Sequence, residues 1–128
     1  MMNPGTTIHL DSVRTADGIT IAELAGQLDL TGVSALREQL LGLLRPDAGR
    51  LVLDLSRVTF CDASGLAVLI GTSHRARRLG GFLRLAAVSP QVDRVLDLTG
   101  LRRHLTVFPT VRDATAAPGG QDVRGRAA

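Results

Sequence analysis

The sequence predicts one α/β domain built on a mixed, mostly parallel β-sheet with one antiparallel edge strand. Its 128 residues are a typical length for a single domain. Alternating apolar segments at 8–14 and 19–24 predict two strands, and the Asp17-Gly18 turn between them predicts a hairpin. Later strands alternate with helices, an order that implies parallel pairing through right-handed crossovers. Residues 26–29 are expected to lead out of the second strand.

The next predicted elements are a helix, a buried strand and a second helix. Apolar residues recur at steps of three and four over 33–44, which indicates an amphipathic helix that Thr31 or Asp29 can cap. The run LVLDL at 51–55 is short, apolar and bounded by turn residues, so we expect a buried strand. A second helix is expected at 64–79, ended by the glycine pair that follows it.

The carboxy-terminal part continues this alternation. Ser89 as a cap and Pro90 in the first turn predict a helix that Gly100 ends. The other expected elements are strands at 82–88 and 105–108 and a short helix at 111–116. The folded domain is therefore predicted to span residues 7–116, with flexible termini at 1–6 and 117–128, because the last segment has almost nothing to bury.

Composition narrows the class of protein. All 15 basic residues counted as Lys or Arg are Arg, and the net charge is only +3, which does not require nucleic acid as a partner. Aromatic residues make up 2% of the chain, too few to provide stacking surfaces for single strands. No secretory signal precedes the domain, and the longest apolar run, 66–70, is too short to span a bilayer. We therefore expect a cytoplasmic protein with no membrane span and no direct contact with nucleic acid.

The sequence contains no recognisable catalytic or cofactor motif. Phosphate-binding loops and the nucleophile-elbow motif are both missing, and the three histidines lack the spacing of metal ligands. The single cysteine, Cys61, cannot form an internal disulfide and is expected to be a small buried side chain. We therefore predict no enzymatic activity, no cofactor and no metal.

Ser64 is the main candidate for a functional residue. It lies in the first turn of a helix that follows a buried strand, where a phosphate would meet unpaired backbone N–H groups and the positive end of the helix dipole. From the local sequence alone, the favoured interpretation is that Asp62 and Ser64 are only helix-capping residues. Asp62 can serve both as a cap and as a group that positions the Ser64 hydroxyl.

The helix surface around Ser64 is unusually small and apolar. If Leu66, Leu69, Ile70 and Ser73 face the core, the stripe with Ser64 presents small or apolar side chains and then a basic one: Ala67, Val68, Gly71 and Arg75. Such a surface suits a protein partner, although Val68 could instead be a lone apolar residue or be covered by a loop. Asp29 is expected near the same end of the sheet, where it either contacts the partner or caps the first helix.

Four sequence blocks resemble the STAS domain, the family named after sulfate transporters and anti-sigma factor antagonists. The blocks occur in the family's order, and the resemblance covers residues 7 to 116. They are VTFCDASGL at 58–66, LAGQLD at 24–29, LGG at 79–81, and SPQV at 89–92 running to LTGL at 98–101.

The resemblance implies a mixed sheet with helices packed on one side and a role as an anti-sigma factor antagonist. The unphosphorylated protein would bind an anti-sigma factor, itself a serine kinase, and so release a sigma factor. Phosphorylation of the serine, by position Ser64, would end the association, and a serine phosphatase would restore it. The implied partner surface combines this serine with the neighbouring candidates: Asp29, Asp62, Ala63, Ser64, Gly65, Ala67, Val68, Gly71 and Arg75.

Two alternatives remain open. The chain could be a constitutive STAS scaffold, such as an accessory subunit of a lipid-transport or signalling complex, with Ser64 never phosphorylated. It could also bind a nucleotide, although no phosphate loop supports this hypothesis.

Overall fold

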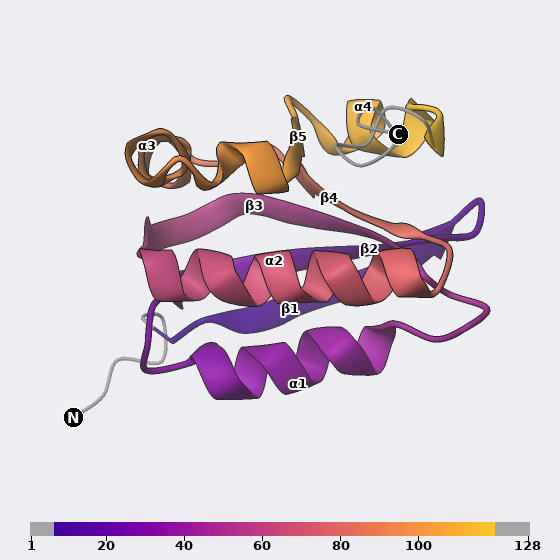
Figure 1. Ribbon diagram of the computed structural model, residues 1–128, viewed down its shortest axis with the longest axis horizontal. Helices are drawn as coiled ribbons and strands as arrows, with labels where there is room; N and C mark the ends of the chain where they lie inside the picture. The colour runs from indigo at the N-terminus through magenta and orange to yellow at the C-terminus, as the bar shows by residue number, and fades with distance from the viewer. Residues whose placement is uncertain (1–6, 120–128) are drawn as a thin grey trace.

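A five-stranded mixed sheet organises residues 7–119, the part of the chain that the computed structural model describes (Figure 1). The strands lie side by side in chain order; β1 pairs antiparallel with β2, and every later pair is parallel. The predicted mixed sheet with one antiparallel edge strand is therefore confirmed. The elements are β1 (His9–Ala16), β2 (Ile19–Leu28), α1 (Val33–Leu43), β3 (Arg50–Cys61), α2 (Ala63–Arg78), β4 (Phe82–Ala86), α3 (Pro90–Thr99), the 3₁₀ helix η1 (Leu101–His104), β5 (Thr106–Phe108) and α4 (Val111–Ala116).

The main core lies between the sheet and three helices. Alternate residues of β3, Leu51, Leu53 and Leu55, are fully buried on the face that α1, α2 and α3 cover. Figure 1 shows α1 and α2 lying side by side along the strands, because each helix returns over the sheet after a parallel strand. The STAS resemblance implies helices on one side of the sheet, and these three helices lie on this face, whereas the short α4 lies on the other.

The opposite face of the sheet is covered by α4. Ala114 of this helix is fully buried and packs in a second apolar cluster with Val52, Phe82 and Ala86. A helix on this face is needed because β2, β3 and β4 all place apolar side chains there. The short helix thus completes the core on the side that the three longer helices leave open.

A buried arginine joins α4 to the sheet. The side chain of Arg84, in the middle of β4, is fully buried, and its guanidinium carbon lies 3.7 Å from the centre of the Phe82 ring. Its nitrogens donate to the carbonyl oxygens of Ala114 at 2.8 Å, Ala117 at 2.9 Å and Pro118 at 2.7 Å. Ala117 and Pro118 fall in the predicted flexible terminus, yet they take part in this hydrogen bonding. The rest of the predicted flexible termini, 1–6 and 120–128, lies outside the described residues.

Strands β2 and β3 run further than the sequence predicts, to Leu28 and Cys61. Residues 26–28 were expected to leave β2, but they pair with the end of β3, and the register shifts next to Gly26. Gly26 has a φ of +112°, and a Cβ there would lie 2.4 Å from the carbonyl oxygen of Thr7. The glycine is therefore a bulge inside the strand, where only a residue without a side chain fits.

The helix ends match the sequence prediction except at α1. Ser89 caps α3 by accepting from the Val92 N–H at 3.4 Å, and Gly100 ends the helix at a φ of +73°. The N-cap of α1 is instead Gly32, with no side-chain cap. Asp29 accepts from the Thr31 N–H rather than from a first-turn N–H of α1, so neither predicted residue caps the helix. A Cβ at Gly32 would lie 2.8 Å from the side chain of Ile8, so glycine fits this position without displacing that side chain.

Candidate functional site

The site around Ser64 forms where β3 ends and α2 begins. Cys61, the last residue of β3, pairs with Leu28 at the end of β2, and the Asp62 N–H donates to the Leu28 carbonyl at 3.2 Å. The first turn of α2 is therefore fixed to the carboxyl edge of two parallel strands, the usual place for sites in α/β folds. Ser64 lies at this edge and is half-buried.

Asp62 is the centre of the hydrogen bonding at this turn. Its Oδ1 accepts from the Ser64 hydroxyl at 2.6 Å and from the Gly65 N–H at 3.1 Å, so it caps α2 and holds the Ser64 side chain at once. The Ser64 hydroxyl lowers the pKa of the Asp62 carboxyl below its ordinary value of 3.8, partial burial opposes this, and backbone N–H groups lower it further. Asp62 is thus an anion at neutral pH, and both predicted roles of this residue are present in the geometry.

Gly65 allows α2 to approach the sheet closely. It is buried, and a Cβ at this position would lie 2.4 Å from the carbonyl oxygen of Leu28. Its neighbour Ala63 is exposed. Of these two predicted partner-binding residues, Ala63 is therefore accessible, whereas Gly65 packs against β2 and shapes the turn.

A groove of about 440 Å³ runs between α1 and α2 and starts at Ser64. One wall comes from three residues of α1 at steps of four, and the other comes from α2. The lining residues are Val33, Arg37, Leu41, Ser64, Ala67, Val68, Gly71 and Thr72. Ala67 and Gly71 are exposed, whereas Val68 is only 9% exposed and packs in the core. The predicted apolar stripe beside Ser64 is therefore one wall of a groove, and Val68 is its least accessible member.

The remaining predicted site residues, Arg75 and Asp29, do not line this groove. Arg75 is exposed on α2, and Asp29 is half-buried in the loop between β2 and α1. The Asp29 Oδ1 accepts from the Thr31 N–H at 3.1 Å, and Gly32 is the N-cap. The capping role considered for Asp29 and Thr31 is therefore wrong, which leaves a partner contact as the open interpretation for Asp29.

Three accessible residues near Ser64 were not singled out by the sequence. Leu30 is 73% exposed in the loop before α1, and Phe60 is 39% exposed near the end of β3. Both side chains are large and apolar, and their backbone lies near the carboxyl edge that also carries Asp62. Phe60 alternates along β3 with the core residue Cys61, so its side chain points to the face of the sheet opposite α1 and α2. Arg37 lines the groove from α1. Its spacing of four from Val33 and Leu41 is the sequence signal that could have placed it there.

Cys61 is a buried side chain, as predicted. It is 2% exposed, and burial raises the pKa of its thiol to about 12, with a smaller contribution from the nearby Asp62 charge. A neutral thiol is a poor nucleophile, so the cysteine serves packing.

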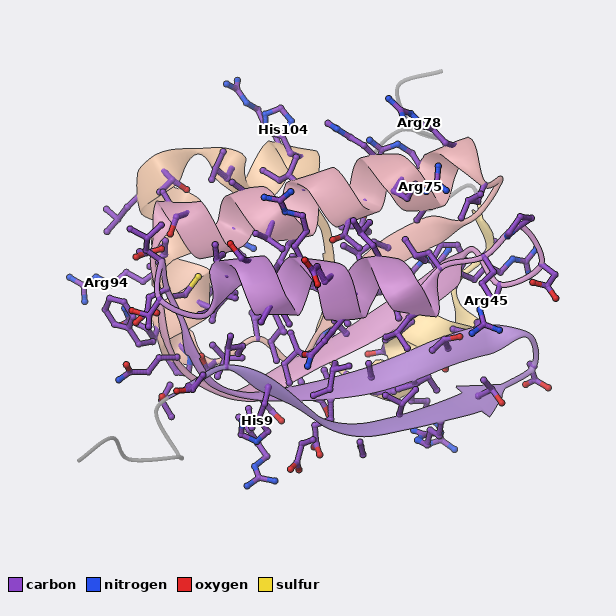
Figure 2. The ribbon with its side chains drawn as sticks, turned by 90° about the horizontal axis from the view of Figure 1, so that it is seen from below. His9, Arg45, Arg75, Arg78, Arg94 and His104 are labelled. Carbon is purple, nitrogen blue, oxygen red and sulfur yellow. The ribbon has the colours of Figure 1, made fainter. Side chains whose placement is uncertain are left out.

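Basic side chains are distributed around the molecule. In Figure 2, Arg45, Arg75, Arg94 and His9 project from different elements toward different sides. Within residues 7–119 there is no cluster of side chains suited to a metal ion, and no helix there is long and apolar enough to cross a membrane.

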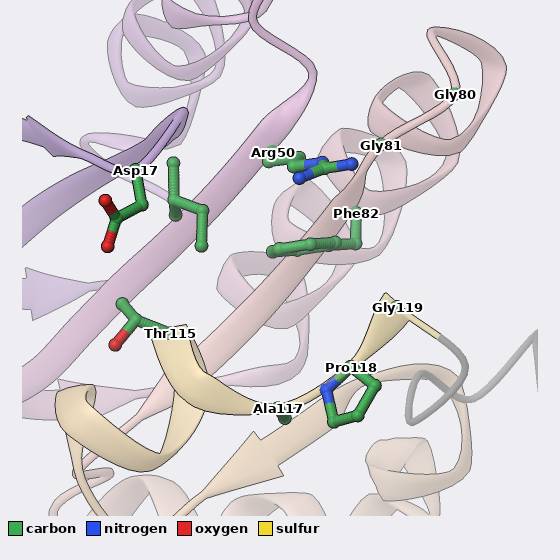
Figure 3. Close-up of a pocket in the computed structure, with 10 residues that line it drawn as sticks. Asp17, Arg50, Gly80, Gly81, Phe82, Thr115, Ala117, Pro118 and Gly119 are labelled. Atoms are coloured by element: carbon green, nitrogen blue, oxygen red, sulfur yellow. The ribbon is translucent and has the colours of Figure 1, made fainter.

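A second cavity lies at the opposite end of the sheet. It has a volume of about 340 Å³, and Asp17, Arg50 and Phe82 line it together with Thr115 and Pro118 of the carboxy-terminal segment (Figure 3). These residues mark the amino ends of the parallel strands, so this cavity and Ser64 lie at opposite edges of the sheet.

The comparison with known families decides the classification. The family described as "STAS domain" matches residues 12–114 of the chain. The chain belongs to the STAS-domain family. The resemblance drawn from the four sequence blocks is therefore confirmed, and the turn at Ser64 belongs to a STAS domain.

Several relatives of this STAS domain have described roles. It is 33% identical over 95 residues to an anti-sigma-B factor antagonist of Bacillus subtilis, covering 74% of this chain and 85% of that protein. It is 32% identical over 92 residues to an anti-sigma F factor antagonist of Paenibacillus polymyxa, covering 71% of this chain and 79% of that protein. A crystal structure of an anti-sigma factor antagonist from Mycobacterium paratuberculosis superposes with a TM-score of 0.75 and 28% identity, over 90% of this chain and 96% of the other.

Proposed function

We propose that this STAS domain is an anti-sigma factor antagonist and that phosphorylation of Ser64 switches it off. The unphosphorylated form binds an anti-sigma factor, a serine kinase, and thereby releases a sigma factor. A serine phosphatase reverses the modification. The similarity to named antagonists over most of the chain supports the binding role. In this proposal the protein acts in the cytoplasm and is a regulator rather than an enzyme.

The observation that carries the switch is the hydrogen bond from Ser64 to Asp62. At 2.6 Å, the carboxylate holds the hydroxyl at the mouth of the groove between α1 and α2. An oriented, half-exposed hydroxyl next to an anion is suited to attack the terminal phosphate of ATP in a kinase active site, because Asp62 stabilises the proton as it leaves the oxygen. Ala63 offers no competing hydroxyl at the neighbouring position.

Phosphorylation replaces the attraction between Ser64 and Asp62 with repulsion. A phosphoserine has no hydroxyl proton to donate to Asp62, and it carries a charge of about −1.5 to −2 at neutral pH. The phosphate and the Asp62 carboxylate then repel each other where they were hydrogen-bonded. A partner surface that fits a neutral hydroxyl would have to bury this charge unpaired, so the complex dissociates.

The proposed partner surface is the predicted set of residues around the groove. Ala63, Ala67 and Gly71 are small and exposed, and Arg75 and Asp29 supply charged groups outside the groove. Gly65 and Val68 contribute indirectly. Gly65 sets the position of α2, and Val68 forms the floor of the groove. The exposed Leu30, in the loop before α1, extends the surface with apolar area. Most of its contact area is thus small or apolar, with Ser64 at its centre.

The test combines mass spectrometry with a binding measurement. The full chain is incubated with ATP and each anti-sigma-type kinase of its host, and any phosphate is mapped; we expect one, on Ser64, and none in Ser64→Ala. Binding of the unmodified protein to the same kinase is then compared with Ser64→Asp, which should bind at least tenfold more weakly. Ser56→Asp is the matched control, since Ser56 is an exposed serine on β3 outside the groove.

Two outcomes would contradict the proposal. If Ser64→Asp binds as tightly as the unmodified protein, charge at this position does not control the complex. If no kinase modifies Ser64 and the chain instead forms a stable complex with another protein, the constitutive scaffold is the better explanation.

A further inference from the structure

The groove beside Ser64 contains a single charged side chain. Of the residues that line it, only Arg37 carries a charge, and Val33 and Leu41 flank it on the same stripe of α1. Arg37 is exposed, and no hydrogen bond or ion pair joins its guanidinium to another residue of 7–119. By contrast, Arg57 pairs with Asp11 at 2.8 Å. An unpaired cation in a largely apolar groove is available for an anion that arrives there.

The direction of the helices brings this cation toward Ser64. Helices α1 and α2 each follow one of two neighbouring parallel strands, so they run in the same direction and begin at the same edge of the sheet. Side chains on a helix lean toward its amino terminus. Arg37, in the second turn of α1, therefore leans toward the end of the groove where Ser64 opens α2.

Phosphorylation would create the anion that Arg37 lacks. A phosphate on Ser64 loses the hydrogen bond to Asp62 and is repelled by it, so the group turns away from that carboxylate. The groove is the neighbouring space, and a guanidinium binds a phosphate through two parallel N–H···O bonds. Building on the proposed function, we propose that Arg37 is the phosphate-binding residue of the phosphorylated form, in which its guanidinium bridges α1 and α2 by pairing with the Ser64 phosphate.

This pairing adds a second effect to the added charge. In the unmodified protein the groove is open and contains an available cation. In the phosphorylated protein the bridge closes the groove at its Ser64 end and neutralises the cation. A partner therefore loses both a place for an apolar side chain and a positive contact, while the phosphate gains a counterion that stabilises the modified state.

The test measures the second ionisation of the phosphate by ³¹P NMR. The full chain is prepared with phosphoserine incorporated at position 64 during translation, so no kinase is needed. We expect the second phosphate pKa to rise by roughly 0.5 to 1 unit in Arg37→Gln, because an opposite charge nearby favours the dianion. In Arg37→Lys, which keeps the positive charge, the second phosphate pKa should lie between that of Arg37→Gln and that of the chain with Arg37. Asp62, which contacts the hydroxyl, is present in every variant.

Arg75→Gln is the matched control. It removes the same charge from the exposed surface of α2, but its position is 11 residues from Ser64, roughly 16 Å along a helix. We expect it to leave the phosphate pKa unchanged. The inference is overturned if Arg37→Gln causes no shift, or if Arg75→Gln causes the same shift, since the effect would then come from net charge.

Failure of this inference can be distinguished from failure of the proposed function. The same phosphorylated protein is tested for binding to the anti-sigma factor. If it binds as tightly as the unmodified protein while Arg37→Gln still shifts the phosphate pKa, the switch fails and the phosphate contact stands. If binding is lost and Arg37→Gln causes no pKa shift, the switch stands and Arg37 is not the residue that holds the phosphate.

Discussion

At two helix ends in this molecule, charged side chains pair with backbone groups that the helix leaves without partners, and the two side chains have opposite charge. At the start of α2, the anionic Asp62 accepts at 3.1 Å from the Gly65 N–H, which has no partner within the helix. At the end of α4, the cationic Arg84 donates to carbonyl groups that have no partner within the helix. Both arrangements place a charge where the helix dipole favours it. They differ in exposure, because Asp62 and Ser64 can be reached from solvent and the Arg84 side chain is fully buried.

The difference shows how accessibility separates a switch from an anchor. A hydrogen bond at the surface costs little to break, so the bond between Ser64 and Asp62 can be replaced by a modification. A buried guanidinium with three carbonyl acceptors cannot lose them without leaving polar groups unsatisfied in the core.

The largest effect is expected for Arg84→Met. Removing the guanidinium leaves the carbonyls at the end of α4 without donors and frees the helix from the sheet, so we expect a loss on the order of 3 kcal/mol in the free energy of unfolding. Urea denaturation measures it. Arg57→Met, which removes a surface pair with Asp11, should change stability by less than about 0.5 kcal/mol. Equal losses in the two variants would refute the anchor role.

A smaller loss is expected when the chain is cut after residue 116. The protein 1–116 lacks the Ala117 and Pro118 carbonyls but keeps Ala114, so Arg84 retains one of these three acceptors. We expect a loss of about 1–2 kcal/mol relative to the protein 1–119. If thermal and urea unfolding do not distinguish the two proteins, these carbonyls are dispensable.

Asp62→Ala should lower the free energy of unfolding by about 1 kcal/mol at neutral pH through loss of the helix cap. The folded-state pKa of Asp62 is depressed, so its contribution is present above the ordinary value of 3.8 and is lost as pH falls through the lower folded value. The difference between the unmodified protein and Asp62→Ala should therefore be constant from pH 7 to about 5 and shrink below that. Asp62→Asn keeps a capping oxygen without the charge, and its stability should vary less in that acidic range.

The smallest effect on stability is expected for Gly71→Ala. Gly71 lies within α2, and a Cβ there meets no atom within 4 Å, so alanine should stabilise the helix by roughly 0.5–1 kcal/mol. Gly42→Ala on α1 is the matched control, since its Cβ is equally unobstructed and lies outside the groove. Both variants should unfold at higher temperature. Partner binding should weaken in Gly71→Ala alone, and equal binding by the two variants would contradict the role of the groove.

Local features of the ends of α2 and α3 were predictable from the sequence, whereas contacts between residues distant in sequence were not. Asp62, Ser89 and Gly100 act on residues within their own turn, so their pattern is visible in the sequence. Arg84 reaches acceptors 30 to 34 residues away, and charged side chains are seldom fully buried, so nothing local marks it as an anchor. The cap of α1 is a similar case, since the close approach of Ile8, from a distant segment, to Gly32 is not visible in the local sequence.

The candidate site also has a local part that the sequence predicts and a part formed by distant residues that it does not. The Asp62–Ser64 turn follows from the order of a buried strand and a helix. The groove requires two helices that lie side by side although they are separated by β3, so one wall could be inferred from α2 and the residues of α1 could not. The pattern of α2 alone predicts that Val68 is exposed, but the neighbouring helix makes this position nearly inaccessible.

Because Cys61 is buried, the alkylation rate of its thiol measures motion at this site. Its thiol, neutral and enclosed immediately before Asp62, can be alkylated only when the end of β3 separates from its neighbours. The rate of labelling by iodoacetamide in native buffer therefore reports how often that strand end opens, with no probe attached. Since this is the protein's only cysteine, modification at Ser64 or capture by a partner would register directly as a change in that single rate.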